Sequence, residues 1–260
     1  MVFAISNQKG GVGKTTTAIN LGVYLAKLGK KTLLIDMDPQ ANLTSGLGFG
    51  KTLQNGQSKI TKNIYQLMTG EAEIESVFIT TATANLSLVP SGIELAGAEV
   101  ELVNQLSRET ILKAAIKNFR KEFEFVIIDC PPSLGILTIN SLVAADKVLI
   151  PVQCEYFALE GLSQLLNTIK LVKTRLNSQL DIGGVVLTMY DTRTNLAKQV
   201  ATEVQKFFAD KVFKTIVPRN VRLSEAPSHG QSISEYDPSS NGAFAYEELA
   251  KEVIKKYCVN

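Results

Sequence analysis

Short continuous runs of apolar residues alternate along the chain with longer segments whose apolar positions recur every three or four residues. The runs are typical of strands buried on both faces, and the recurring pattern is typical of amphipathic helices. The predicted strands are residues 2–6, 31–36, 86–90, 125–129, 147–152, 182–188 and 213–217. The predicted helices are residues 15–28, 63–68, 93–106, 111–119, 136–143, 159–176, 196–208 and 243–257. This alternation predicts an α/β fold: a mostly parallel, twisted sheet with helices on both faces.

Nothing in the chain suggests a second domain. We find no internal repeat, low-complexity tract or linker, and residues 46–58, rich in Gly, Ser, Asn and Gln, predict a surface loop. A length of 260 residues is within the range of one large α/β domain. We therefore expect a single domain over residues 1–260.

Composition narrows the function classes. The formal net charge of +2 is nearly neutral, so any binding of nucleic acid must come from a local patch. The cysteines Cys130, Cys154 and Cys258 are scattered, which argues against a disulfide framework and a structural zinc site and predicts free thiols. The chain has neither a leader-like start nor an apolar run long enough to cross a bilayer, so we expect a soluble, cytoplasmic protein.

A glycine-rich segment, K-G-G-V-G-K-T, lies between the first predicted strand and the first predicted helix. Glycines allow a tight turn whose N–H groups point inward at an anion, and the helix that follows adds its positive end. Lys14 is placed to reach the β and γ phosphates, and the Thr15 hydroxyl to ligate Mg²⁺. The segment predicts a nucleotide site formed by Lys9, Gly10, Gly11, Val12, Gly13, Lys14, Thr15 and Thr16.

The segment departs from the strict pattern G-x-x-x-x-G-K-[ST] at one position, because Gln8 replaces the first glycine and a second lysine, Lys9, follows it. The run N-Q-K-G-G-V-G-K-T-T-T (7–17) resembles the deviant phosphate loop of the ParA/MinD ATPases, most closely the chromosomal ParA proteins, often called Soj. Three more stretches are similar to that family: L-I-D-M-D-P-Q (34–40), I-I-D-C-P-P-S (127–133) and P-R-N-V-R-L-S-E-A-P-S-H-G (218–230). The resemblance covers nearly the whole chain. It implies a P-loop NTPase-like fold and a partner-stimulated ATPase of chromosome or plasmid segregation that uses ATP, ADP and Mg²⁺.

Asp38 and Asp129 follow or end apolar strands, where open parallel sheets place ligand-binding groups. The resemblance implies that Asp38 positions the attacking water and that Asp129 lies on the Mg²⁺ side with Thr15. It also implies that Lys9 crosses a dimer interface to the partner's phosphates, and that the loop from Pro218 to Asn220 closes over the adenine. Lys9, Lys14 and Asp38 are thus the predicted catalytic residues. The alternatives are a capping role for each carboxylate and a solvated loop position for Lys9.

DNA is one candidate binding partner of this predicted ATPase. Arg193 follows a predicted strand, Arg219 and Arg222 lie in a later loop, and four lysines lie nearby at positions 198, 206, 211 and 214. Taken alone, these charges could be a solvated face. The resemblance implies an ATP-bound homodimer that binds DNA without sequence preference, associates with the nucleoid, and is reset by a ParB-like partner.

Other targets and activities are less compatible with the residues. A MinD-like membrane ATPase needs a terminal amphipathic helix with a bulky apolar face, whereas residues 251–260 are mixed in charge, so we expect no membrane binding. An iron–sulfur carrier needs paired cysteines, which Cys130 lacks. A phosphotransferase needs an acceptor-binding domain, so water is the expected acceptor. His229 is expected to be a loop residue.

Overall fold

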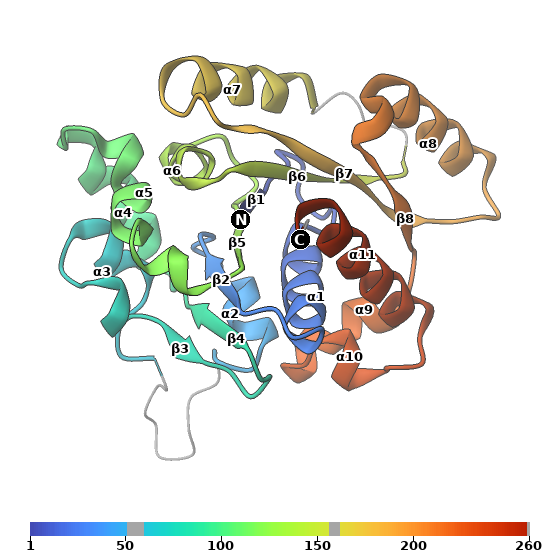
Figure 1. Ribbon diagram of the computed structural model, residues 1–260, viewed down its shortest axis with the longest axis horizontal. Coiled ribbons are helices and arrows are strands. Elements are labelled where there is room, and N and C mark those ends of the chain that lie inside the picture. The colour runs from blue at the N-terminus through green and yellow to red at the C-terminus, as the bar shows by residue number, and fades with distance from the viewer. Residues whose placement is uncertain (51–59, 156–161, 259–260) are drawn as a thin grey trace.

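The computed structural model describes residues 1–50, 60–155 and 162–258, and these residues form an eight-stranded sheet with helices on both faces (Figure 1). The strands are β1 (Val2–Ile5), β2 (Thr32–Asp36), β3 (Ile79–Thr80), β4 (Leu86–Val89), β5 (Phe125–Asp129), β6 (Lys147–Gln153), β7 (Asp181–Tyr190) and β8 (Val212–Pro218). Their order is β3-β4-β2-β5-β1-β6-β7-β8. Only the β3–β4 pair among the described strands is antiparallel. The predicted mostly parallel sheet is confirmed.

Helices fill most of the connections between strands. The α-helices are α1 (Lys14–Lys27), α2 (Asn42–Gly46), α3 (Ile64–Thr69), α4 (Leu95–Glu101), α5 (Ile111–Ile116), α6 (Ile136–Ala144), α7 (Leu162–Arg175), α8 (Asn195–Phe208), α9 (Val221–Glu225), α10 (Ile233–Tyr236) and α11 (Asn241–Tyr257). The 3-10 helices are η1 (Ile74–Ser76), η2 (Leu102–Asn104), η3 (Arg108–Thr110), η4 (Phe119–Glu122), η5 (Ala209–Lys211) and η6 (Ala226–His229).

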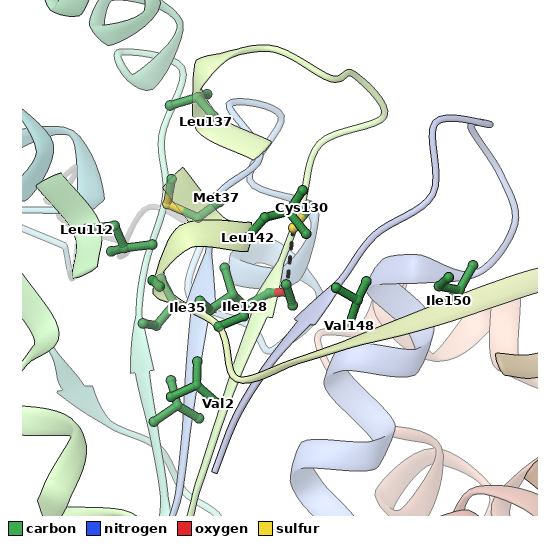
Figure 2. Packing of buried hydrophobic residues seen from close by; sticks show 14 of the residues in the cluster. Val2, Ile35, Met37, Leu112, Ile128, Cys130, Leu137, Leu142, Val148 and Ile150 are labelled. Carbon is green, nitrogen blue, oxygen red and sulfur yellow. Dashed lines mark hydrogen bonds between the residues drawn. The ribbon is translucent and has the colours of Figure 1, made fainter. Parts of the chain in front are cut away.

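Successive strand residues face opposite sides of the sheet, which gives the domain two cores. In β5, Val126 and Ile128 belong to one core, whereas Phe125 and Ile127 belong to the other. Helices α3 to α8 cover the first face, and α1, α2, α9, α10 and α11 cover the second (Figure 1). Figure 2 shows the first core, in which the Cys130 thiol lies 3.9 Å from the carbonyl oxygen of Ile128. Because both faces are covered, the loops after the strands are where a ligand can reach the sheet.

Strand β1 lies between β5 and β6 in the sheet. The strands β2 to β5 lie on one side of it, and β6 to β8 lie on the other. Ligands of open parallel sheets bind at such a reversal of strand order, beyond the carboxyl ends of the strands. The glycine-rich segment follows β1 directly. The loops after β2, β5, β7 and β8 open at the same edge of the sheet.

Several predicted bounds are wrong. The predicted helix over 93–106 is interrupted after α4, and the one over 111–119 ends with α5 at Ile116. Helices α2, α9 and α10 and strand β3 were not expected, because two to five residues are too few to show a helical or strand period. Most of the predicted 46–58 loop, and the predicted start of the 159–176 helix, lie outside the described residues.

Helix α11 packs along the domain, as its amphipathic pattern predicts. Its Tyr246 and Leu249 are buried in the second core, and the Tyr246 hydroxyl is 3.1 Å from the Thr17 hydroxyl of α1. Phe244, on the outer side, is 55% exposed. In the part of the chain that the structure describes, no helix combines the length and the apolar character needed to cross a bilayer.

Candidate nucleotide site

The loop between β1 and α1 has the backbone conformation of a phosphate loop. Gly11 and Gly13 have φ values of 73° and 87°, in the left-handed region that favours glycine. A methyl group at Gly10 or Gly11 would meet no described atom within 4 Å, so this side of the loop is open. Helix α1 begins at Lys14 without a side-chain cap, so its first N–H groups lack acceptors within the helix. The loop can therefore surround an anion at a helix N-terminus.

Two side chains that the sequence did not single out hold this loop on the sheet. The Asn7 amide donates to the Pro151 carbonyl of β6 (2.7 Å) and accepts from the Lys9 N–H (3.0 Å). The Thr188 hydroxyl of β7 donates to the Val12 carbonyl (2.9 Å). Asn7 lies in the family-like run, but no local pattern marks Thr188, which is 176 residues from Val12 in the chain.

Lys14 is 6% exposed, and its ammonium group donates to the Lys9 carbonyl (3.1 Å). Burial lowers the pKa of Lys14, while the nearby Asp129 opposes that shift. A buried cation beside an open anion-binding loop gains most from a phosphate that would neutralise it.

Asp36 and Asp129 end neighbouring strands opposite each other, and both are fully buried. Burial raises the pKa of Asp36 to about 6, and hydrogen bonds from Thr44 and Asp38 oppose the shift. Burial raises the pKa of Asp129 well above its ordinary value, and the charge of Asp36 adds to that effect.

Asp129 is the carboxylate that fits a metal ion. Within the described residues, no group satisfies either of its buried carboxylate oxygens with a hydrogen bond. The Thr15 hydroxyl and the Lys14 ammonium group both favour its ionised form. A hydroxyl and a carboxylate are oxygen ligands of the kind Mg²⁺ takes beside nucleotide phosphates.

Asp38 lines a cavity of about 550 Å³, which is also lined by Gly10, Gly11, Lys14 and Thr15. Its side chain is nearly buried, and its Oδ1 accepts from the Gln40 N–H (3.0 Å). Asp38 therefore shares one space with six of the eight residues predicted for the nucleotide site, and Lys9 and Val12 are the two that do not line it.

A second cavity, of about 320 Å³, adjoins the first. Pro218 and Asn220 line it opposite Thr16, and Gly13, Thr16 and Met189 line both cavities. Asn220 also caps α9 by accepting from the Arg222 N–H (2.8 Å). The predicted base-binding loop thus lies next to the phosphate loop. Met189, with φ at 51°, was not expected there.

Lys9 does not line these two cavities. It lies with Arg219 on a third, of about 560 Å³, together with Met189 and Thr194. The Arg219 N–H donates to the Tyr190 carbonyl (3.0 Å), which holds the loop after β8 beside the loop after β7. Lys9 thus lines a different cavity from Lys14, and Arg219, a predicted DNA-binding residue, lines the same cavity as Lys9.

Each predicted DNA-binding arginine is exposed and forms an ion pair with a carboxylate. The pairs are Arg193 with Asp191 (2.7 Å), Arg219 with Glu155 (2.8 Å) and Arg222 with Glu225 (2.9 Å). Hydrogen bonds from Arg193 lower the pKa of Asp191 to about 2. Nothing in the sequence indicated these pairs. Exposed ion pairs are weak, so phosphate can exchange with the carboxylates.

The cysteines are free thiols, as predicted. Burial raises the pKa of Cys130 to about 12 and that of Cys154 to about 11, so both are protonated near neutral pH. His229 lies at the end of η6 and stacks on Tyr236 (4.9 Å between ring centres).

Known proteins are similar to this chain in sequence and in fold. A family model described as an AAA domain matches residues 1–182. The chain is 56% identical over 252 residues to the sporulation initiation inhibitor protein Soj of Bacillus subtilis, covering 97% of each. It is 56% identical over 250 residues to the chromosome-partitioning ATPase Soj of Treponema pallidum, covering 96% of this chain and 95% of that one. The crystal structure of cobyrinic acid a,c-diamide synthase from Mycobacterium smegmatis, with bound ADP and magnesium, is similar with a TM-score of 0.83 and 36% identity, over 99% of this chain and 95% of that one.

Proposed function

The chain belongs to the ParA/MinD family of ATPases, and on that premise we propose that it is a chromosome-partitioning ATPase that uses ATP as a switch. The observation that carries the proposal is the deviant phosphate loop, in which Lys14 lines the phosphate cavity while Lys9 lines a separate one. The 56% identity to a chromosome-partitioning ATPase favours this function over that of the diamide synthase, at 36%.

In the proposed mechanism, the loop N–H groups and Lys14 bind the phosphates, and Thr15 and Asp129 hold Mg²⁺. The metal supplies charge neutralisation on the phosphoryl oxygens. Asp38 orients the attacking water, and Pro218 and Asn220 bound the space for adenine. These roles are supported by the shared cavity and by the unpaired oxygens of Asp129.

Lys9 acts across a dimer. Lys9 lines a cavity other than the phosphate cavity, so a second copy facing this side of the loop could receive the Lys9 ammonium group at its nucleotide. A cation supplied in trans stabilises charge on the transferring phosphoryl group, as an arginine finger does. ATP binding and dimerisation then depend on each other.

The ATP-bound dimer binds DNA without sequence preference, which places the protein on the nucleoid, and a ParB-like partner resets it by stimulating hydrolysis. Arg193, Arg219 and Arg222 contact backbone phosphates after exchanging their carboxylate partners. Such contacts carry affinity and no base readout.

The DNA role predicts the effect of Arg222→Ala on binding to a mixed-sequence duplex. With ATP, the affinity for DNA should fall by a similar factor for every duplex sequence. The negative slope of log K against log salt concentration should become shallower by about one, because one phosphate contact is lost. Fluorescence anisotropy at several salt concentrations measures both.

Lys251→Ala is the matched control, since it removes an exposed charge from α11 that pairs with Glu247 and Glu248. Its salt slope should equal that of the wild type. If the wild-type protein bound no DNA either with or without ATP, this role would be ruled out.

A further inference from the structure

The loop that carries Asp38 is held by a closed set of hydrogen bonds. Asp36 accepts the Asp38 N–H at Oδ1 (3.1 Å), and its Oδ2 accepts both the N–H (2.9 Å) and the hydroxyl (2.7 Å) of Thr44. The Thr44 hydroxyl accepts the Ser91 N–H (2.9 Å), and the Ser91 hydroxyl donates to the Asp38 carbonyl (2.8 Å). The N–H and the carbonyl of Asp38 are therefore both hydrogen-bonded within this set.

The three residues come from separate elements: Asp36 ends β2, Thr44 lies in α2, and Ser91 follows β4. Asp36 is fully buried, and Thr44 and Ser91 are 1% and 4% exposed. Buried hydrogen bonds with every partner in place restrict motion strongly. Removing the Thr44 hydroxyl leaves the buried Ser91 N–H unpaired, whereas removing the Ser91 hydroxyl leaves the Asp38 carbonyl with only the Ala41 N–H (2.9 Å). The set thus fixes one conformation of the chain around Asp38.

We propose that Thr44 and Ser91 are positioning residues for ATP hydrolysis, which act by fixing the backbone of Asp38. This inference rests on the proposed role of Asp38 in orienting water. One of its carboxylate oxygens is bound by the Gln40 N–H from the same turn, so where the carboxylate lies in the phosphate cavity depends on where the backbone is held. A displacement of about 1 Å in a catalytic group can lower a rate by about 100-fold.

Two substitutions remove single members of the set. Thr44→Val keeps the side-chain shape and removes the hydroxyl, whereas Ser91→Ala removes the bond to Asp38 and keeps the Ser91 N–H on Thr44. Each should lower kcat about 10-fold or more and leave the KM for ATP unchanged, because neither residue belongs to the phosphate loop. Thr44→Ser, which restores the hydroxyl, should recover most of kcat.

Thr32→Val is the matched control. Thr32 is fully buried at the other end of β2, and its hydroxyl donates to the Lys30 carbonyl (2.9 Å). This variant loses a threonine hydroxyl from the same strand without touching Asp38. Its kcat should equal that of the wild type.

Hydrogen–deuterium exchange gives a readout that is independent of activity. Peptides that cover residues 37–45 should exchange faster in Thr44→Val and Ser91→Ala than in the wild type or Thr32→Val. Asp38→Ala keeps both backbone bonds and loses only the bond from the Gln40 N–H, so apart from that one amide it should retain protection while losing hydrolysis.

Three results would overturn the proposal: wild-type kcat in both Thr44→Val and Ser91→Ala, faster exchange without loss of kcat, or a fall in kcat matched by weaker ATP binding. Ser91→Ala keeps the test valid if Thr44→Val does not fold. If Asp38→Ala itself hydrolyses ATP at the wild-type rate, the role of Asp38 fails, and the exchange data still report separately on the hydrogen bonds.

Discussion

Lys14→Ala should abolish ATP binding. The Lys14 ammonium group is buried beside the open phosphate loop and already donates to the Lys9 carbonyl of that loop (3.1 Å). Hydrogen bonds to charged groups contribute about 1.5–3 kcal/mol each, and the ammonium group can reach two phosphates. We therefore expect the Kd to rise by roughly 100-fold or more. Equilibrium titration with a fluorescent ATP analogue measures this change.

Lys27→Ala is the control, because Lys27 lies at the exposed last turn of the same helix. It should bind ATP as the wild type does. Lys14→Ala should also stay folded, since the substitution removes a buried charge with a single hydrogen bond. Binding by Lys14→Ala within a few-fold of the wild-type Kd would contradict the placement of the phosphates.

Asp38→Ala should separate binding from hydrolysis. Asp38 faces the phosphate cavity but holds no part of the phosphate loop, so ATP should still bind. The attacking water would lose its orienting carboxylate, and we expect hydrolysis to fall by about 100-fold or more. Single-turnover phosphate release with enzyme in excess measures the chemical step.

The matched control is Asp210→Ala, which removes an exposed carboxylate from η5. Its rate should be unchanged. Wild-type hydrolysis by Asp38→Ala would exclude the proposed role for this residue. Loss of ATP binding together with hydrolysis would show that Asp38 supports the site and does not act on water.

The sequence predicted those features that local pattern encodes. Strands buried on both faces leave continuous apolar runs, such as 125–129, and the phosphate loop is set by neighbouring glycines and Lys14. Asp38 and Asp129 could also be expected near the phosphate loop, because parallel strands end at one edge of the sheet.

The missed features depend on contacts between distant residues. Thr188 binds Val12 across most of the chain, and Ser91 binds Asp38 from the loop after β4, the second strand after β2. A helix or strand period places single residues in elements, but it does not show which distant side chains bind each other. The pairing of Arg193 with Asp191 is local, but charge count alone does not show which side chains meet.

Light scattering after size exclusion tests the central claim, that ATP binding makes two copies of the protein dimerise with Lys9 at their interface. The protein should run as a monomer without nucleotide and with ADP, and as a dimer with ATP and Mg²⁺. Asp38→Ala should hold the ATP dimer for longer, and Lys9→Ala should stay a monomer. A single monomeric mass for wild type and Asp38→Ala under all three conditions would contradict the account.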